Sequence, residues 1–250
     1  MLLSFVPVIF SFGGIELIGI TAGEAENPEK NIPKAIHQVI YRILIFYVGT
    51  MLVLMTLWSW KEVGTEASPF VQIFDKIGIP AAANILNFVV LTAAVSVYNS
   101  AIYSNSRMLY GMATSSNAPK FFEKLSKRKV PVNGILVSSG ITLLAVILNY
   151  LAPEEIFMYL MSIVTGAVMI SWAMIILTHM KFREYCEKNG IEPKFKSLFY
   201  PFANYLCLAF IVLILILMAT MEEMRLAEFI MPVWLFIIWI FYKKYHGKKQ

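Results

Sequence analysis

The sequence predicts an all-α protein that crosses a membrane several times. Of the 250 residues, 58% are hydrophobic and only 15% are charged, whereas a soluble domain carries about 25% charged residues. Several uncharged stretches reach the roughly 18 residues that mark a membrane-spanning helix. Because lipid cannot satisfy backbone polar groups, and because no segment alternates like a barrel strand, these spans should be helices.

We expect seven spans in a single transmembrane domain that covers residues 1–250. Their approximate ranges are 2–23, 34–58, 80–112, 132–151, 155–180, 199–220 and 226–245. The last four spans form two hairpins, one through Ala152, Pro153 and Glu154 and one through "MEEMR". In the fifth span Trp172 could contribute to an aromatic wall, although most such residues serve packing.

The first span is interrupted by Gly13, Gly14 and Glu16. Glycine weakens a helix by about 1 kcal/mol relative to alanine, so the pair favours unwinding at this point. An unwound helix within the membrane presents carbonyl and amide groups that can bind a small zwitterion. The alternative is that the glycines allow two helices to pack closely.

Glu16 is a candidate functional residue because an unpaired carboxylate costs a few kcal/mol to insert into a bilayer. Its side chain should therefore face the protein interior. It is either a proton-coupling residue or a structural acceptor that holds the unwound segment in place.

Two connections carry recognisable turn and cap residues. The loop "GEAENPEKNIPK" contains Pro28 and Pro33, which we expect to stop helix on either side. After the second span, "SPFVQIFDKIG" predicts a short amphipathic helix on the outer surface, with Ser68 as N-cap, Pro69 at its first position and Gly78 at its end. That helix is either part of an external lid or a plain interfacial helix.

The third span carries a belt of polar residues near mid-depth. The belt comprises Ser96, Tyr98, Asn99, Ser100, Tyr103 and Ser104. Ser96, Asn99 and Tyr103 share one helical face, which predicts that they line a substrate cavity or an aqueous pathway. Hydrogen bonding between helices is the alternative. Beyond this span, "APKFFEKLSKRKVP" predicts an interfacial helix on the anionic inner leaflet.

The basic residues are distributed unevenly across the seven spans. When Lys and Arg are sorted by alternate sides, 18 of the 21 fall on one side, and only Lys61, Lys76 and Arg225 fall on the other. This asymmetry predicts that the basic side, with the C-terminus, is cytoplasmic. Topology thus explains the net charge of +5, and we expect a lipid bilayer and no nucleic acid as partner.

Motifs for catalysis or metal binding are missing from the sequence. His37, His179 and His246 lack the spacing of metal ligands, and Cys186 and Cys207 lie on different levels of the membrane. There is no HExxH, no GxSxG and no nucleotide-binding glycine-rich loop. We therefore expect no metal, no cofactor and no enzymatic activity.

The beginning of the chain predicts that it is part of a longer one. Met1 opens directly into an apolar run without the positively charged n-region of a signal peptide. Seven spans with a cytoplasmic C-terminus would also place this start outside. We expect the chain to be the C-terminal portion of a protein whose earlier spans precede it.

Several motifs resemble one family across essentially the whole chain. They include "FSFGGIELIGITAGEAENPEKNIPKA", "QVIYRILIFYVGT", "SVYNSAIYSNSRMLYGMA" and "YPFANYLC". Together they resemble the second half of the bacterial amino acid permeases of the amino acid, polyamine and organocation superfamily. Within it the aromatic amino acid permeases, especially the phenylalanine-specific one, are the most similar.

The resemblance implies a leucine-transporter-like fold, built on a five-plus-five inverted repeat, of which this chain supplies helices six to twelve. It also implies uptake of an amino acid by proton symport across the bacterial inner membrane, with the proton gradient as the driving force. The segment of Phe10, Ser11, Phe12, Gly13, Gly14 and Glu16 matches the unwound part of helix six. Its carbonyl groups would accept the substrate's ammonium group, and one of its aromatic residues would cover the substrate side chain.

Half of such a binding site would lie outside this chain, because helices one to five are missing. A complementary N-terminal fragment is therefore a possible partner. Two alternatives stay open: a permease for another amino acid, and an inactive truncated or structural membrane subunit.

Overall fold

The computed structural model describes residues 4–22, 25–61, 68–76, 78, 80–193, 195–222 and 224–246. Within these ranges the chain is helical and contains no strand, which confirms the all-α class. Six helices in the described ranges are long and apolar enough to cross a membrane. The first apolar segment is not among the six because it is divided into two short helices, so the count of seven spans is not confirmed.

The chain divides into two compact units. The first unit contains Met1–Leu17, Met112–Lys120 and Ser139–Gln250, and the second contains Ile18–Gly111 and Phe121–Ser138.

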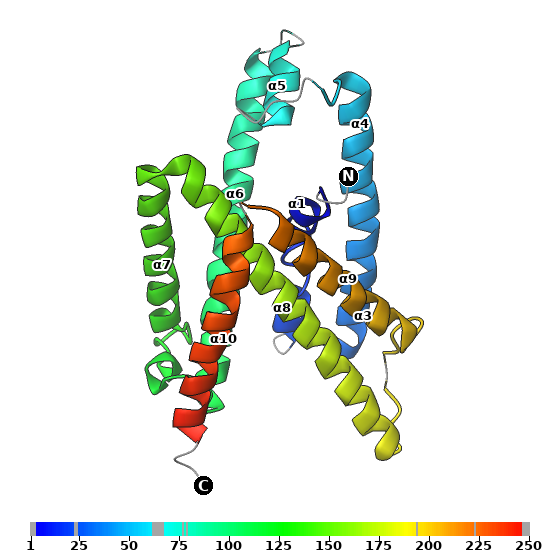
Figure 1. The fold of residues 1–250 in the computed structure, drawn as a ribbon, viewed down its shortest axis with the longest axis vertical. Helices are drawn as coiled ribbons and strands as arrows, with labels where there is room; N and C mark the ends of the chain where they lie inside the picture. The colour runs from blue at the N-terminus through cyan, green and yellow to red at the C-terminus, as the bar shows by residue number, and fades with distance from the viewer. Residues whose placement is uncertain are drawn as a thin grey trace. The chain divides into compact units, whose positions relative to one another are not determined.

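Helix α8 (Pro153–Lys188) organises the first unit. It packs against α1 (Phe5–Phe10), α9 (Phe202–Thr220) and α10 (Arg225–His246), and Figure 1 shows it running between α9 and α10. The core of this unit includes the fully buried side chains of Val6, Met169, Ile214 and Met218. Helix α1 is therefore anchored by apolar contacts although it is only six residues long.

A small residue brings α8 and α10 close together. A Cβ atom added to Gly166 would lie 3.3 Å from Cγ of Met231 and 3.5 Å from Cβ of Ala227. Contacts of this kind, in which glycine and alanine let helices approach, are common between membrane helices.

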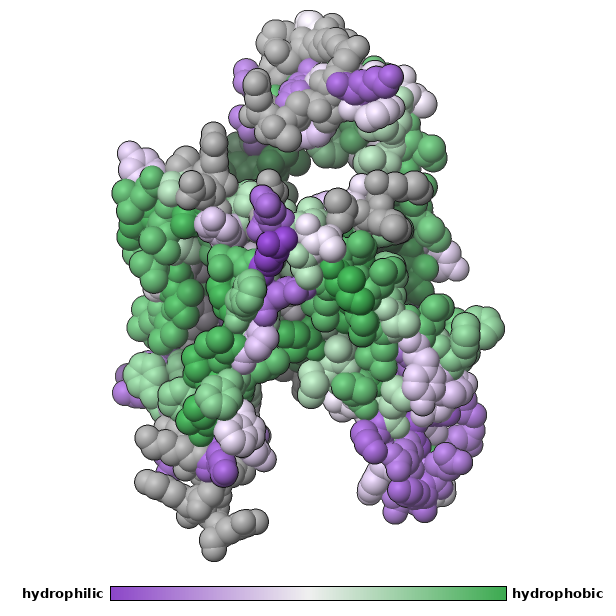
Figure 2. Space-filling view, viewed as in Figure 1, coloured by the Kyte–Doolittle hydropathy of each residue, from purple (hydrophilic) through white to green (hydrophobic). Residues whose placement is uncertain are grey.

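The polar side chains of the first unit gather near helix ends. Figure 2 shows apolar side chains over the helices and polar ones where α8 ends and the following loop begins. This segment includes Lys181, Lys188, Glu192 and Lys196. The pattern suits a bundle whose middle faces lipid and whose ends face water.

The second unit begins with one long span, Pro28–Leu57. It consists of α3 (Pro28–Arg42), a π-helical segment η3 (Ile43–Val48) and α4 (Gly49–Leu57). Pro28 occupies the start of α3, where a missing N–H is harmless. The prediction that Pro33 also stops helix is wrong: Pro33 lies inside α3, near its start, where the loss of one hydrogen bond leaves the long helix that follows intact.

The predicted short helix after this span is confirmed as α5 (Pro69–Lys76). Its Ile73 is buried, and Phe70, Ile73 and Phe74 line an apolar cavity of about 430 Å³ together with residues of η3 and α4. The apolar face of α5 thus faces a membrane-spanning helix. A role as lid stays a prediction.

Helix α6 (Pro80–Thr114) is approached closely by the start of α7 (Val132–Leu151). A Cβ atom on Gly134 would lie 2.9 Å from Cα of Ser106, a residue that is itself 2% exposed. The prediction of an interfacial helix in "APKFFEKLSKRKVP", which connects α6 and α7, is wrong, because the segment forms only the 3-10 turn η4 (Lys120–Glu123) and a loop. The Asn133 side-chain amide donates a hydrogen bond of 2.7 Å to the carbonyl of Phe121, which ties the loop to α7.

Candidate functional site

The first apolar segment leaves the α-helical path at its glycine pair. Helix α1 ends at Phe10, residues 11–16 form turns, and α2 (Leu17–Thr21) follows. At the break the N–H of Phe12 donates to Ile9 (2.9 Å) and that of Gly13 donates to Phe10 (3.1 Å). These bonds span three residues rather than four, so the helix tightens before it opens. The predicted interruption is confirmed.

The two glycines differ in conformation and surroundings. Gly14 has a φ of +102°, a conformation that side chains other than glycine rarely adopt. At Gly13 an added Cβ atom would lie 3.3 Å from the carbonyl oxygen of Phe10 in the same segment, and 3.8 Å from Cγ2 of Val168 on α8, which is an ordinary van der Waals distance. The break therefore requires glycine at position 14, whereas close helix packing as the reason for Gly13 stays a prediction.

Glu16 stabilises the break through its side chain. Its Oε2 atom accepts a hydrogen bond from the backbone N–H of Gly14 at 3.1 Å and another from the indole N–H of Trp172 at 3.2 Å. The carboxylate is half-buried. The structure thus shows Glu16 in the place of a structural acceptor, and its role in proton coupling stays a prediction.

Trp172 reaches Glu16 because of where it lies on α8. Val168, Met169 and Trp172 recur at helical spacing and belong to the core that buries Val6 and Ile9 of α1. The face of α8 that packs against α1 therefore also carries the indole to the break. Residues 16 and 172 are 156 positions apart, so no local pattern in the sequence links them. The sequence suggests only that Trp172 could belong to an aromatic wall, and it does not predict the hydrogen bond from its indole N–H to Glu16.

The remaining side chains of the break are at least partly accessible. The ring of Phe10 is 40% exposed, and Phe12 is half-buried. Ser11 is exposed, and its hydroxyl donates to the Val8 carbonyl at 2.6 Å, which helps to finish α1. Phe10 is thus the aromatic residue of the segment with the most accessible ring.

The polar belt of the third span lies in the second unit, on α6. Ser96 and Asn99 are both exposed there, and the hydroxyl of Ser100 donates to the Ser96 carbonyl at 3.0 Å. Ser104 of the belt is buried at 4% exposure, and the Tyr103 ring lies beneath the Arg107 guanidinium at 5.7 Å. The belt therefore splits between an exposed face and a packed one. The contribution of Ser96 and Asn99 to a substrate site stays a prediction.

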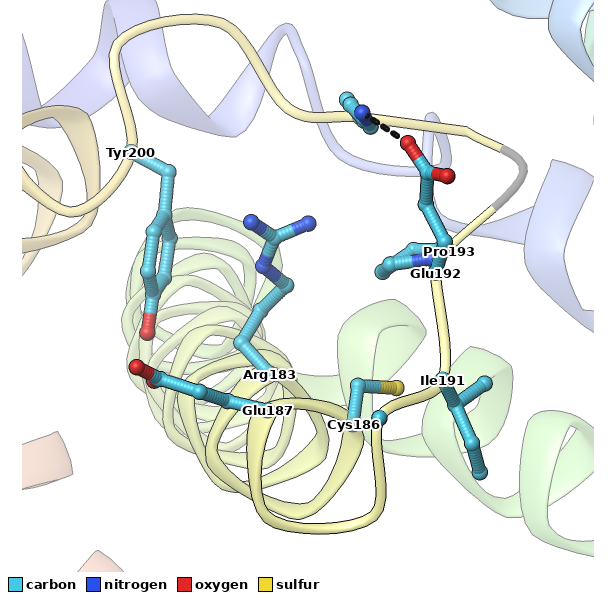
Figure 3. Close-up of a pocket in the computed structure, with 9 residues that line it drawn as sticks. Arg183, Cys186, Glu187, Ile191, Glu192, Pro193 and Tyr200 are labelled. Atoms are coloured by element: carbon cyan, nitrogen blue, oxygen red, sulfur yellow. Dashed lines mark hydrogen bonds and ion pairs between the residues drawn. The ribbon is translucent and has the colours of Figure 1, made fainter.

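A separate cavity of about 430 Å³ lies at the end of α8 (Figure 3). The Arg183 guanidinium lies 4.8 Å from the centre of the Tyr200 ring, and its buried Nη1 has no acceptor. An ion pair between Lys196 and Glu192 closes one side and lowers the pKa of the Glu192 carboxyl. Glu187 also belongs to the lining, so the described lining residues carry both acidic and basic groups, and they do not indicate a ligand of one charge.

Comparison with known proteins identifies the family. The sequence model of the family described as "Amino acid permease" matches residues 1–250. The aromatic amino acid transport protein AroP of Salmonella typhimurium (strain SL1344) is 54% identical over 94% of this chain and 51% of its own length. AroP of Escherichia coli (strain K12) is 52% identical over the same shares. The uncharacterized transporter YdgF of Bacillus subtilis (strain 168) is 45% identical over 100% of this chain and 54% of its own.

No solved structure is significantly similar to the chain. The chain spans about half the length of the curated relatives that it matches. Because the family match extends from the broken first segment to the last helix, the chain belongs to the amino acid permease family.

Proposed function

We propose that this chain is the C-terminal part of a permease that takes up an aromatic amino acid, with phenylalanine as the first candidate. The support for the substrate class is the identity of 54% and 52% to proteins named for aromatic amino acid transport. The single observation that carries the mechanism is the break at residues 11–16, where α1 opens within an apolar bundle.

The break offers groups that suit a zwitterion. In a membrane, irregular backbone is tolerated where it lines a cavity, and the ends of half-helices carry partial charges. Carbonyl groups of the segment Phe10–Gly14 would accept hydrogen bonds from the ammonium group of the substrate. Phe10, with its accessible ring, would contact an aromatic side chain of the substrate. Ser96 and Asn99 would contribute polar contacts from α6.

We propose proton symport as the source of energy, with Glu16 as the coupling residue. A half-buried carboxylate in the broken segment can change its charge in step with substrate binding, and no cofactor is needed because the proton gradient drives uptake. The protein would lie in the bacterial inner membrane. Its C-terminus would be cytoplasmic, since 18 of its 21 Lys and Arg residues share that side.

The relatives' greater length suggests what completes the protein. The chain corresponds to about half of each, and residues 89–101 of α6 are exposed along nearly their whole length. We propose that a preceding or complementary segment of about equal length supplies the remaining helices and the rest of the substrate site.

Two other functions compete with this one. A permease for another amino acid would share the family and the broken helix. A structural or inactive membrane subunit would share the fold but transport nothing. The DNA upstream of the codon for Met1 helps to separate them, because five further hydrophobic segments encoded there would favour a transporter.

Uptake of labelled phenylalanine by the full-length protein, in cells without their own aromatic permeases, tests the proposal. We expect tyrosine and tryptophan to compete strongly, alanine and lysine to compete weakly, and a protonophore to abolish accumulation. Equal competition by a non-aromatic amino acid would move the assignment to another substrate. Absence of uptake of every amino acid tested would favour the structural subunit.

A further inference from the structure

We propose that Trp172 is a positioning residue for substrate binding, because its indole N–H holds Glu16 and thereby fixes the backbone of the break. The inference rests on the proposed function. It adds a residue from α8, far away in the sequence, to the machinery of the first segment.

Gly14 and Trp172 share one hydrogen-bond acceptor. One oxygen of Glu16 accepts from both the Gly14 N–H at 3.1 Å and the Trp172 indole at 3.2 Å. The first bond closes the turn within the segment, and the second fixes that turn to α8. Gly14 at φ +102° would otherwise be free to adopt many conformations. The Trp172–Glu16 bond thus limits the conformations of the peptide groups that would face the substrate.

Helix α8 holds the Trp172 indole in a fixed place. Trp172 packs against the apolar core that contains Met169, Ile214 and Met218. One turn earlier on α8, Val168 lies 3.8 Å from the position that a Cβ of Gly13 would take. Helix α8 therefore holds the break by the hydrogen bond to Glu16, next to the apolar packing of α1 on α8.

The bond between Trp172 and Glu16 lies at the long end of the normal range, at 3.2 Å, and it is partly buried, where a hydrogen bond is worth more than in water. If it is removed, Glu16 keeps only its bond to Gly14 and can turn away from α8. Misplaced backbone groups bind the substrate more weakly, so we expect a loss of roughly tenfold in apparent affinity.

The test is a double-mutant cycle in the full-length protein. Trp172→Phe keeps an aromatic ring against the core but removes the N–H donor together with part of the indole, whereas Glu16→Ala removes the acceptor. We expect Trp172→Phe to raise the KM for phenylalanine roughly tenfold, with Vmax per molecule in the membrane changed less than about twofold. Because Glu16→Ala removes the proposed coupling carboxylate, KM is measured in all variants by exchange of labelled for unlabelled phenylalanine. In the Glu16→Ala background the change at Trp172 should have no further effect on this KM.

Trp234→Phe is the matched control, because Trp234 is an exposed tryptophan of α10. The KM of this variant should equal that of the unaltered protein. Multiplicative effects in the double mutant would overturn the proposal. An unchanged KM in Trp172→Phe would also overturn it. The same holds if uptake by Trp172→Phe falls only because less protein is present in the membrane.

A readout that does not depend on transport completes the test. The indole N–H resonance of Trp172, identified by its loss in Trp172→Phe, should move upfield in Glu16→Ala and stay in place in Glu228→Ala. If the unaltered protein transports phenylalanine and the Trp172 resonance does not move in Glu16→Ala, the positioning role of Trp172 is wrong and the proposed function still stands. If the unaltered protein takes up no amino acid, the proposed function fails and this inference fails with it, whatever the resonance does.

Discussion

Two spans of this protein depart from the regular α-helix, and they do so in different ways. The first apolar segment opens at residues 11–16, whereas the span Pro28–Leu57 widens into the π-helical segment Ile43–Val48 and continues. A π-helix keeps its backbone hydrogen-bonded internally. The open turn keeps backbone hydrogen bonds at Phe12 and Gly13, but the N–H of Gly14 donates to the Glu16 carboxylate, which also accepts from the Trp172 indole.

In this protein the open turn is tied to another helix by a side-chain hydrogen bond, whereas the π-helical segment continues directly into α4. Gly49 follows the π-helical segment in ordinary helical geometry (φ −61°), and a Cβ there would meet nothing within 4 Å. At Gly14 the backbone itself requires glycine. Substitutions at the two positions should therefore differ, and four experiments test how far the contrast extends.

The largest effect is expected for Gly14→Ala. A side chain at φ +102° is strained by roughly 2–3 kcal/mol, and the break can relieve the strain only by changing shape. Uptake of phenylalanine by the full-length protein should fall more than about tenfold. Gly19→Ala in α2, where an added Cβ meets nothing within 4 Å, is the control and should transport normally. Normal uptake by Gly14→Ala would contradict the importance of the turn.

The second largest effect is expected for Gly134→Ala, which should lower the stability of the protein because the added methyl group does not fit between α6 and α7. The added methyl group would lie 2.9 Å from the backbone of Ser106, which cannot move away as a flexible side chain does. We expect a loss of roughly 1–2 kcal/mol, seen as a lower melting temperature of the purified protein in detergent. Gly140→Ala, on the same helix and without neighbours within 4 Å, should melt at the same temperature or slightly higher, because alanine has the higher helix propensity. Equal melting of the two variants would show that α6 and α7 do not pack this closely.

Glu16→Gln should separate the two roles of that residue. The amide oxygen can still accept from Gly14 and Trp172, so we expect stability to change by less than about 1 kcal/mol. The variant cannot carry the proton, so accumulation against a gradient should be lost while exchange of labelled for unlabelled phenylalanine persists. Accumulation with an unchanged pH profile would exclude Glu16 as the coupling residue and leave it a structural one.

The smallest effect is expected for Gly49→Ala. With helical geometry and no neighbour within 4 Å of the added Cβ, alanine should stabilise the span by up to about 1 kcal/mol through its higher helix propensity. The melting temperature should rise slightly, and uptake should stay within about twofold. A large loss of uptake with intact stability would instead show that the π-helical segment must move during transport.

Residues close in sequence predicted much of the local structure. The glycine pair predicted the break, and "SPFVQIFDKIG" predicted α5, because conformational freedom and capping depend on a few neighbouring residues. The same kind of reasoning failed for "APKFFEKLSKRKVP", which forms one 3-10 turn and a loop. Its alternation of lysines and aromatics suits an interfacial helix, but the hydrogen bond from Asn133 to Phe121 holds the segment in another path.

The candidate site divides along the same line. Gly13, Gly14 and Glu16 are conspicuous in the sequence because glycine and a carboxylate are costly within an apolar span. Trp172 is not, since an aromatic residue in an apolar helix is ordinary. The sequence suggests at most a place in an aromatic wall, and only the hydrogen bond to Glu16, across 156 residues, connects Trp172 with the break.

The sequence alone determined that this protein is a helical membrane protein, and it predicted a break of the first segment near residue 13 with close helix packing as the alternative. The physical reason is that long apolar stretches must form helices in lipid, and that glycine weakens a helix locally. The tertiary structure decided that the segment breaks and how the break is held: by a left-handed Gly14 and by one carboxylate oxygen shared by Gly14 and Trp172. These contacts depend on the packing of α1 on α8, which no stretch of neighbouring residues specifies.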